Sequence, residues 1–102
     1  MAMRFLYNNI SFKPGSNNND EGSLVVTGEI TNDSGRDFNA VVFKMVLFIK
    51  TRCIGHLTIT MNGFRNGQTK TFREMVSELE LVPGFKIMPE LIRYEIYPES
   101  AY

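Results

Sequence analysis

Cysteine, tryptophan and histidine are almost missing from this chain of 102 residues, which has one cysteine, no tryptophan and one histidine. The single cysteine, Cys53, excludes an internal disulfide bond and any metal site that needs several thiolates. No uninterrupted apolar run approaches the roughly 18 residues of a membrane-spanning helix. The formal net charge is +0, which excludes a bulk electrostatic attraction to nucleic acid or to anionic lipid.

The chain does contain enough apolar material for one folded domain. Hydrophobic residues make up 43% of the sequence, a share typical of globular proteins rather than of disordered chains. A length of 102 residues fits a single domain over 1–102. Residues 1–7 include one basic residue and no apolar segment of signal-peptide length. The compartment stays open: the chain is cytoplasmic, or it is a piece of a longer exported protein.

Apolar and polar residues alternate over several short stretches, which is the pattern of half-buried β-strands. In one of them Leu24, Val26 and Ile30 share a face. The stretch 39–50 is apolar on both faces, which predicts a central strand whose second face is covered or meets a partner. The predicted strands cover 4–13, 23–31, 39–50, 55–61, 69–76 and 91–97. Six or seven such strands, separated by turn signals, predict an all-β fold and an antiparallel β-sandwich.

Local signals mark irregular points along these strands. The apolar face of the first strand changes parity at Asn8–Asn9, which predicts a β-bulge. Thr51–Arg52 is expected to form a turn between two strands. Asn62–Gly63 and Asn66–Gly67 are both turn dipeptides, because Asn and Gly tolerate positive φ.

Gly28 falls on the apolar face of its strand, between large apolar residues. A position without a side chain at such a site usually receives a bulky neighbour. We therefore expect a ring of Phe43, Phe72 or Tyr94 to pack over Gly28. The competing explanation is a bulge with positive φ, which also selects glycine.

The segment 69–81 has two competing patterns. Its apolar residues fit the helical spacing i, i+3, i+4, i+7, and they are Phe72, Met75, Val76 and Leu79. Its neighbours in the sequence are all predicted strands, and a sheet needs partners. We favour a strand to about Val76, followed by a short helical turn near 77–90.

The string VTGEITNDSGRDF at residues 26–38 resembles the opening of the FxLYD family, small immunoglobulin-like domains of prokaryotic surface proteins. The residues that carry the resemblance are Gly28, Glu29, Ile30, Asn32, Ser34 and Gly35. Residues 66–72 look like the family's glycine turn and aromatic strand, and the similarity covers about 24–76. Ile49 stands where the family has its namesake aspartate. The resemblance implies an immunoglobulin-like sandwich, a non-enzymatic accessory or adhesion role outside the cytoplasm, and no catalytic residues.

Residues with reactive side chains show no catalytic, cofactor-binding or metal-binding pattern, and no enzyme or cofactor is expected. His56 lies on a polar strand face without a nearby carboxylate, and Cys53 has no base at a legible spacing. We expect His56 to be a solvated surface histidine and Cys53 to be a passive thiol. The acidic residues of the C-terminal part are Glu74, Glu78, Glu80, Glu90, Glu95 and Glu99. They are expected to lie on polar strand faces.

Charge is divided unevenly along the chain. Residues 36–73 contain seven basic residues and one acidic residue, whereas six acidic and two basic residues follow. One hypothesis is therefore a binder of single-stranded nucleic acid or another polyanion. Its contacts would be Lys44, Lys50, Arg52, Arg65 and Lys70. The zero net charge favours neutralisation within the molecule instead, so a nucleic-acid partner is not the first expectation.

The favoured hypothesis is a non-catalytic β-sandwich domain that binds protein, including a second copy of itself. Its candidate interface is the second face of strand 39–50, which carries Val42, Val46 and Phe48. Apolar residues exposed together on a sheet form a patch whose burial is favourable. Two glycosylation sequons, at Asn9 and Asn32, are a weaker pattern.

Overall fold

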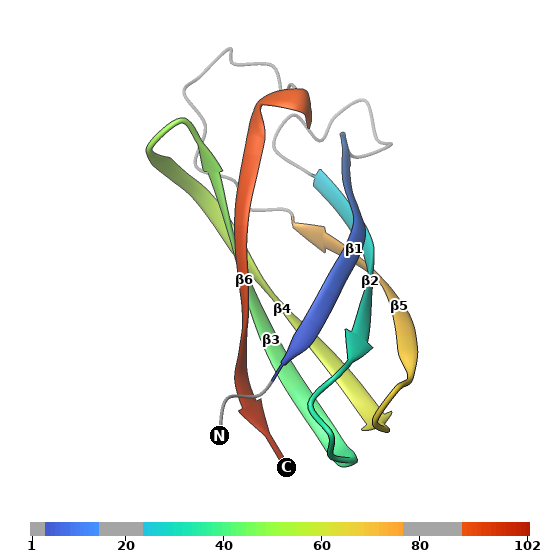
Figure 1. The fold of residues 1–102 in the computed structure, drawn as a ribbon. Helices are drawn as coiled ribbons and strands as arrows, with labels where there is room; N and C mark the ends of the chain where they lie inside the picture. The colour runs from blue at the N-terminus through green and yellow to red at the C-terminus, as the bar shows by residue number, and fades with distance from the viewer. Residues whose placement is uncertain (1–3, 15–23, 77–88) are drawn as a thin grey trace.

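A computed structural model of the chain describes residues 4–14, 24–76 and 89–102. These residues form six β-strands and one short 3-10 turn (Figure 1). The strands are β1 (Phe5–Pro14), β2 (Leu24–Asn32), β3 (Phe38–Ile49), β4 (Arg52–Phe64), β5 (Thr69–Val76) and β6 (Ile92–Ala101), and the turn is η1 (Pro89–Leu91). The prediction of an all-β fold is confirmed.

The strands form two antiparallel three-stranded sheets, with the orders β1-β2-β5 and β4-β3-β6. In Figure 1 the two sheets lie one over the other, an arrangement consistent with a β-sandwich. β3 is the central strand of its sheet, as its apolar character on both faces predicts. Both of its partners follow it in the chain: β4 comes directly after β3, and β6 is the last of the described strands.

The core lies between the sheets and is built by the alternate residues that the sequence pattern places inward. On β3 these are Val41, Phe43, Met45 and Leu47, each 0% exposed. Phe5 of β1 packs edge-on against Phe43 at 5.0 Å between ring centroids, and stacks on Phe64 of β4 at 6.0 Å. These contacts join the two sheets at the end of the core where β1 begins and β4 ends.

The predicted bulge in β1 is present. The register with β2 shifts between Asn8 and Ser11, and Asn9 has φ 55°. The extra residue returns both apolar sets to the core side, so that Tyr7 and Phe12 both pack against the core despite their opposite parity. The parity change in the sequence is thus explained by one residue inserted into an edge strand.

Two predicted turns are displaced in the structure. The Asn62–Gly63 pair lies inside β4, where Gly63 takes φ 61° without ending the strand. The chain turns instead at Asn66–Gly67, where Gly67 has φ 85°. The β3–β4 turn is centred on Lys50–Thr51, one residue before the predicted place.

Gly28 receives an aromatic ring, as predicted, and the ring is that of Phe72. The two residues are direct partners in the β2–β5 register. A Cβ built on Gly28 would lie 2.9 Å from the Phe72 ring and would also meet the Ile10 side chain. Gly28 is not among the residues with positive φ, so packing and not backbone strain selects glycine here.

The ambiguous segment forms a strand in its described part, since β5 runs to Val76 and pairs with β2 along its length. The helical turn predicted near 77–90 falls mostly on residues 77–88, which lie outside the described residues, as does Leu79. At its end, Pro89–Leu91 form a single 3-10 turn before β6. In the described part of the chain, no helix has the length and apolarity to cross a membrane.

Candidate interaction surface

The candidate interface predicted from the sequence lies on the side of the β4-β3-β6 sheet that faces away from the core. We call this surface the outer face. Its middle row is Val42, Lys44, Val46 and Phe48 of β3. Thr60, Thr58, His56 and Cys53 of β4 lie opposite these four residues on one side, and Ser100, Tyr97, Glu95 and Arg93 of β6 on the other.

The three predicted interface residues are brought together on this face. Val42, Val46 and Phe48 follow one another at two-residue intervals along β3, and each is partly exposed. They are shielded in part because β3 has a neighbouring strand on both sides. The result is a narrow apolar row along the middle of the outer face, interrupted once by Lys44.

The borders of this row differ in polarity. On the β4 side Thr58 and Thr60 are short and uncharged, whereas on the β6 side Tyr97 leaves 44% of its surface exposed.

The described residues form one ion pair, between Arg4 and Asp33. Charged residues of the outer face therefore have no ionic partner within the described part of the molecule.

The basic residues of the polyanion hypothesis do not gather on one patch. Arg52 begins β4 and Arg65 follows its end, so the two lie about 40 Å apart along an extended strand. Lys50 occupies the β3–β4 turn beside Arg52, and Lys44 lies on the outer face. Lys70 belongs to the other sheet, where its ammonium group donates to the Asn62 carbonyl. Figure 1 shows β4 running between the two ends of the molecule.

The two reactive side chains, His56 and Cys53, occupy successive positions of the β4 row on the outer face. His56 is exposed on the outer face opposite Val46, and Cys53 is exposed with its Sγ 3.8 Å from the Gly55 carbonyl oxygen. Among the described residues, no three histidine, cysteine or carboxylate side chains are grouped for a metal ion. Glu90, Glu95 and Glu99 are exposed and Glu74 is partly exposed, while Glu78 and Glu80 lie outside the described residues.

Asn32 is the most completely bonded polar residue of the described chain, and the sequence pattern did not reveal its burial. Its side chain is 0% exposed. The Nδ2 group donates to the Arg36 carbonyl at 2.8 Å and to the Phe64 carbonyl at 3.1 Å. The Oδ1 atom accepts from the Ser34 amide at 3.0 Å and from the Ser34 hydroxyl at 2.6 Å. Asn32 therefore ties the end of β2 to β4, across the two sheets.

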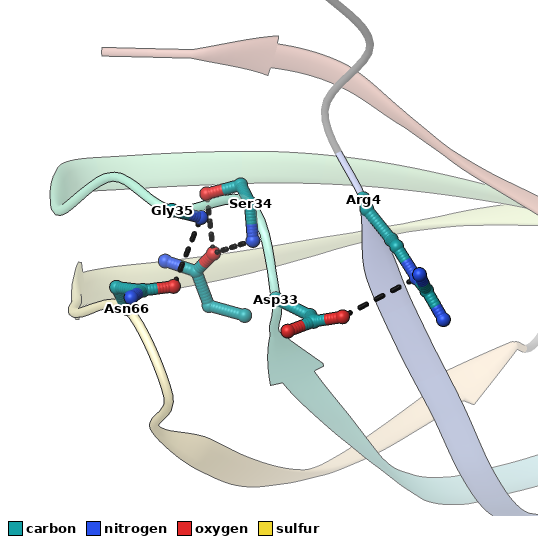
Figure 2. Close-up of polar contacts among 6 residues, drawn as sticks. Arg4, Asp33, Ser34, Gly35 and Asn66 are labelled. Atoms are coloured by element: carbon teal, nitrogen blue, oxygen red, sulfur yellow. Dashed lines mark hydrogen bonds and ion pairs between the residues drawn. The ribbon is translucent and has the colours of Figure 1, made fainter.

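The same end of the molecule holds a second set of polar contacts, and Figure 2 draws those between Gly35 and Asn66 and between Arg4 and Asp33. The Gly35 amide donates to Oδ1 of Asn66 at 2.9 Å, and the Asn66 amide donates to Asp37 at 2.8 Å. Arg4 pairs with Asp33 at 3.2 Å across exposed side chains. These contacts hold the β2–β3 and β4–β5 turns together. The Nδ2 group of Asn32 is buried and donates to the Arg36 and Phe64 carbonyls, so the Asn32 sequon is not available for glycosylation in the folded protein.

Comparisons of the chain with protein-family models, with curated proteins and with solved structures give no match. The resemblance of residues 24–76 to the FxLYD family stays a prediction. The function is therefore argued from the geometry of the chain itself.

Proposed function

We propose that the chain is a non-catalytic interaction domain that binds protein through its outer face, including a second copy of itself. The observation that carries the proposal is the partly exposed row of Val42, Val46 and Phe48 on the central strand. A monomer gains about 25 cal/mol for each Å² of apolar surface that a partner removes from water. A row at the middle of a flat sheet can be covered by one partner.

The composition of the borders supports the same proposal. Thr58 and Thr60 are short and uncharged, so a partner can approach the row without burying a charge on that side. Tyr97 offers an aromatic ring with a polar tip, a residue type enriched at interfaces. Lys44 is partly exposed within the row and supplies one charged contact for orientation.

The test is self-association measured by light scattering over a wide concentration range. Val46→Asp places a carboxylate in the middle of the row and is expected to weaken association. The matched control is Thr71→Lys, an exposed position on β5 of the other sheet, which is expected to leave association unchanged. A strictly monomeric wild-type chain at the highest soluble concentration would contradict self-association.

The polyanion hypothesis has weaker geometric support, because its basic residues are spread over both ends of the molecule and both sheets. It predicts an affinity for single-stranded nucleic acid that falls steeply with salt. We expect a flat titration of a single-stranded oligonucleotide even at low salt. Saturable binding that Lys50→Glu or Arg52→Glu abolishes would favour the polyanion hypothesis over protein binding.

We further propose that the two sheets have an immunoglobulin-like arrangement, akin to that of the FxLYD domains. In that arrangement strands A, B and E share one sheet, and strands C and F lie together in the other. The order β1-β2-β5 and the pairing of β3 with β6 are compatible with it. An experimental structure whose strands superpose on immunoglobulin-like domains in the same order would test the assignment.

A further inference from the structure

β6 is an edge strand with an unusually regular free side. Within the described residues it pairs with β3 alone, and the pairing runs without a register shift from Ile92 to Pro98 (Figure 1). A free edge presents unpaired N–H and C=O groups to any other strand. Proteins commonly block such edges with a bulge, a proline or a lysine.

The other edge strands carry such blocks, whereas β6 carries one only at its far end. β1 has the bulge at Asn8–Asn9, β4 has a register shift between Cys53 and Gly55, and β5 carries Lys70. On β6 the register shifts after Pro98, which also lacks an N–H donor. The stretch from Ile92 to Tyr97 contains no lysine, proline or bulge.

Exposed apolar side chains also concentrate at this strand. The described chain has six large hydrophobic residues that are exposed, and four of them lie on β6 or directly beside it. These four are Leu91, Tyr94, Tyr97 and Tyr102. Tyr94 is 39% exposed although its ring already contacts Phe12 of β1, at 5.8 Å between centroids.

We propose that β6 pairs edge to edge with β6 of a second copy, antiparallel, with Tyr94 on the two-fold axis. This register places each Arg93 opposite Glu95 of the second copy, and each Ile92 opposite Ile96. Directly opposed residues of an antiparallel pair lie on the same face and about 4.5–5.5 Å apart at Cβ, so both charge pairs can form. Pro98 falls outside the paired stretch.

Charge complementarity selects this register among the neighbouring ones. A shift that centres the axis on Glu95 sets the two Glu95 carboxylates against each other, which is unfavourable. A shift by one residue in the pairing would exchange the two faces and turn Ile92 and Ile96 toward the polar side. Only the register centred on Tyr94 pairs opposite charges twice and apolar residues twice within the regular stretch.

The pairing goes beyond the proposed function, because it uses the edge of the sheet and not its outer face. It joins the two β4-β3-β6 sheets into one continuous sheet of six strands. The two outer faces then lie side by side, and a partner bound there meets both copies at once. Arg93 and Glu95 also border the outer face, so the two surfaces are distinguished by the double charge swap and by the cysteine pair, which depend on the edge register.

A charge-swap experiment tests the pairing. Arg93→Glu or Glu95→Arg alone sets like charges opposite each other twice, and we expect the dimerisation constant in sedimentation to fall by about tenfold. The double variant Arg93→Glu/Glu95→Arg restores both pairs and is expected to return to within about threefold of the wild type. Arg73→Glu, an exposed charge reversal on β5 of the other sheet, is the matched control and leaves the constant unchanged.

A cross-linking experiment tests the register. In a Cys53→Ser background, Tyr94→Cys brings two cysteines to about 5.5 Å between Cα atoms, within disulfide range. We expect a covalent dimer under mild oxidation. Tyr97→Cys is equally exposed, but in this register the two copies of the residue lie about 20 Å apart, so it stays monomeric.

Three results would overturn the pairing: a monomeric wild type, a double charge swap that fails to restore association, or equal cross-linking at both cysteine positions. Circular dichroism identifies any charge variant that has not folded. In that case the cross-linking experiment alone decides whether the pairing forms. Dimers that Val46→Asp disrupts and Arg93→Glu leaves intact would support the outer face and reject the edge. The opposite outcome would support the edge and leave self-association through the outer face rejected.

Discussion

Asn32 shows how a single buried polar residue is accommodated in a small all-β domain. A buried side-chain amide is costly unless its hydrogen-bonding groups find partners. Here both ends of the amide are used, toward two carbonyls and toward one serine. No buried side-chain nitrogen or oxygen of the described residues is left without a partner. The amide is therefore a connection between the sheets rather than a defect in the core.

Replacing Asn32 tests that role. Asn32→Ala leaves the buried Phe64 carbonyl without its side-chain donor, and we expect a loss of about 1–3 kcal/mol in the free energy of unfolding. Asn32→Asp retains the acceptor for Ser34 but cannot donate when ionised, so it is expected to be at least as destabilising at neutral pH. Urea denaturation measures both, with Arg73→Ala, an exposed position of β5, as the control. Equal stability of all four proteins would contradict the role of the amide.

Gly28 is expected to tolerate no side chain because the side chains of Ile10 and Phe72 occupy the space. The ring atoms of Phe72 lie 2.9 Å from the position of an added Cβ. Gly28→Val should therefore overpack the site and lower the free energy of unfolding by about 1–3 kcal/mol. Thermal melts of Gly28→Val, Gly28→Ala, Phe72→Leu and Gly28→Ala/Phe72→Leu measure the effect, and the double variant should lose less than the sum of the two single variants. An unchanged melting temperature for Gly28→Val would refute the packing explanation.

Tyr7 links stability to alkaline pH. Removal from water disfavours the phenolate and raises the pKa of Tyr7 from 10.0 to about 12. In the unfolded chain the phenol ionises at its ordinary pKa, near 10. The stabilising contribution is thus complete below about pH 10 and is lost as the pH rises toward 12. We expect Tyr7→Phe to remove this part of the pH dependence, seen as a shallower loss of stability from pH 10 to 12. Identical profiles would contradict the assignment.

At the scale of the elements, the local pattern predicted the strands, and long-range contacts decided their boundaries. The alternation in β2 was sufficient to predict that strand. The two apolar faces of β3 were sufficient to predict its central position. The prediction of a turn at Asn62–Gly63 was wrong, because a glycine with positive φ can also lie within a strand. The sequence places Asn32 in a sequon and in the FxLYD-like string, and neither pattern indicates that its side chain is buried. Its burial depends on Phe64, thirty-two positions away, which no local pattern reveals.

The candidate surface was predictable in part for the same reason. Parity along one strand placed Val42, Val46 and Phe48 on a shared face, which the structure reproduces. The residues that border them belong to β4 and β6, and their register follows from the complete sheet. The sequence of β6 alone does not show that it is an edge strand, because edge strands and central strands differ only in which strands lie beside them.

The β3–β4 turn gives a prediction at the scale of the element. Lys50 has φ 57°, a conformation that costs a residue with a Cβ roughly 1–2 kcal/mol. Lys50→Gly removes this cost and adds some entropy to the unfolded chain, so we expect a net gain of about 1 kcal/mol. Thermal unfolding measures it, and Thr58→Gly, within the strand, should be destabilising instead. A loss of stability in Lys50→Gly would show that the turn is not strained.

For the whole molecule, the central position of β3 depends on a strand that is synthesised long after it. Until β6 is present, β3 is an edge strand with apolar residues on both faces, the profile of an aggregation-prone segment. The domain should therefore fold late, after residues 92–101 are available, and slowly for its size, as proteins dominated by non-local pairings do. A chain shortened before Ile92 should precipitate rather than persist as a smaller domain. By pairing with β3, β6 thus removes an exposed apolar edge at which other chains could add.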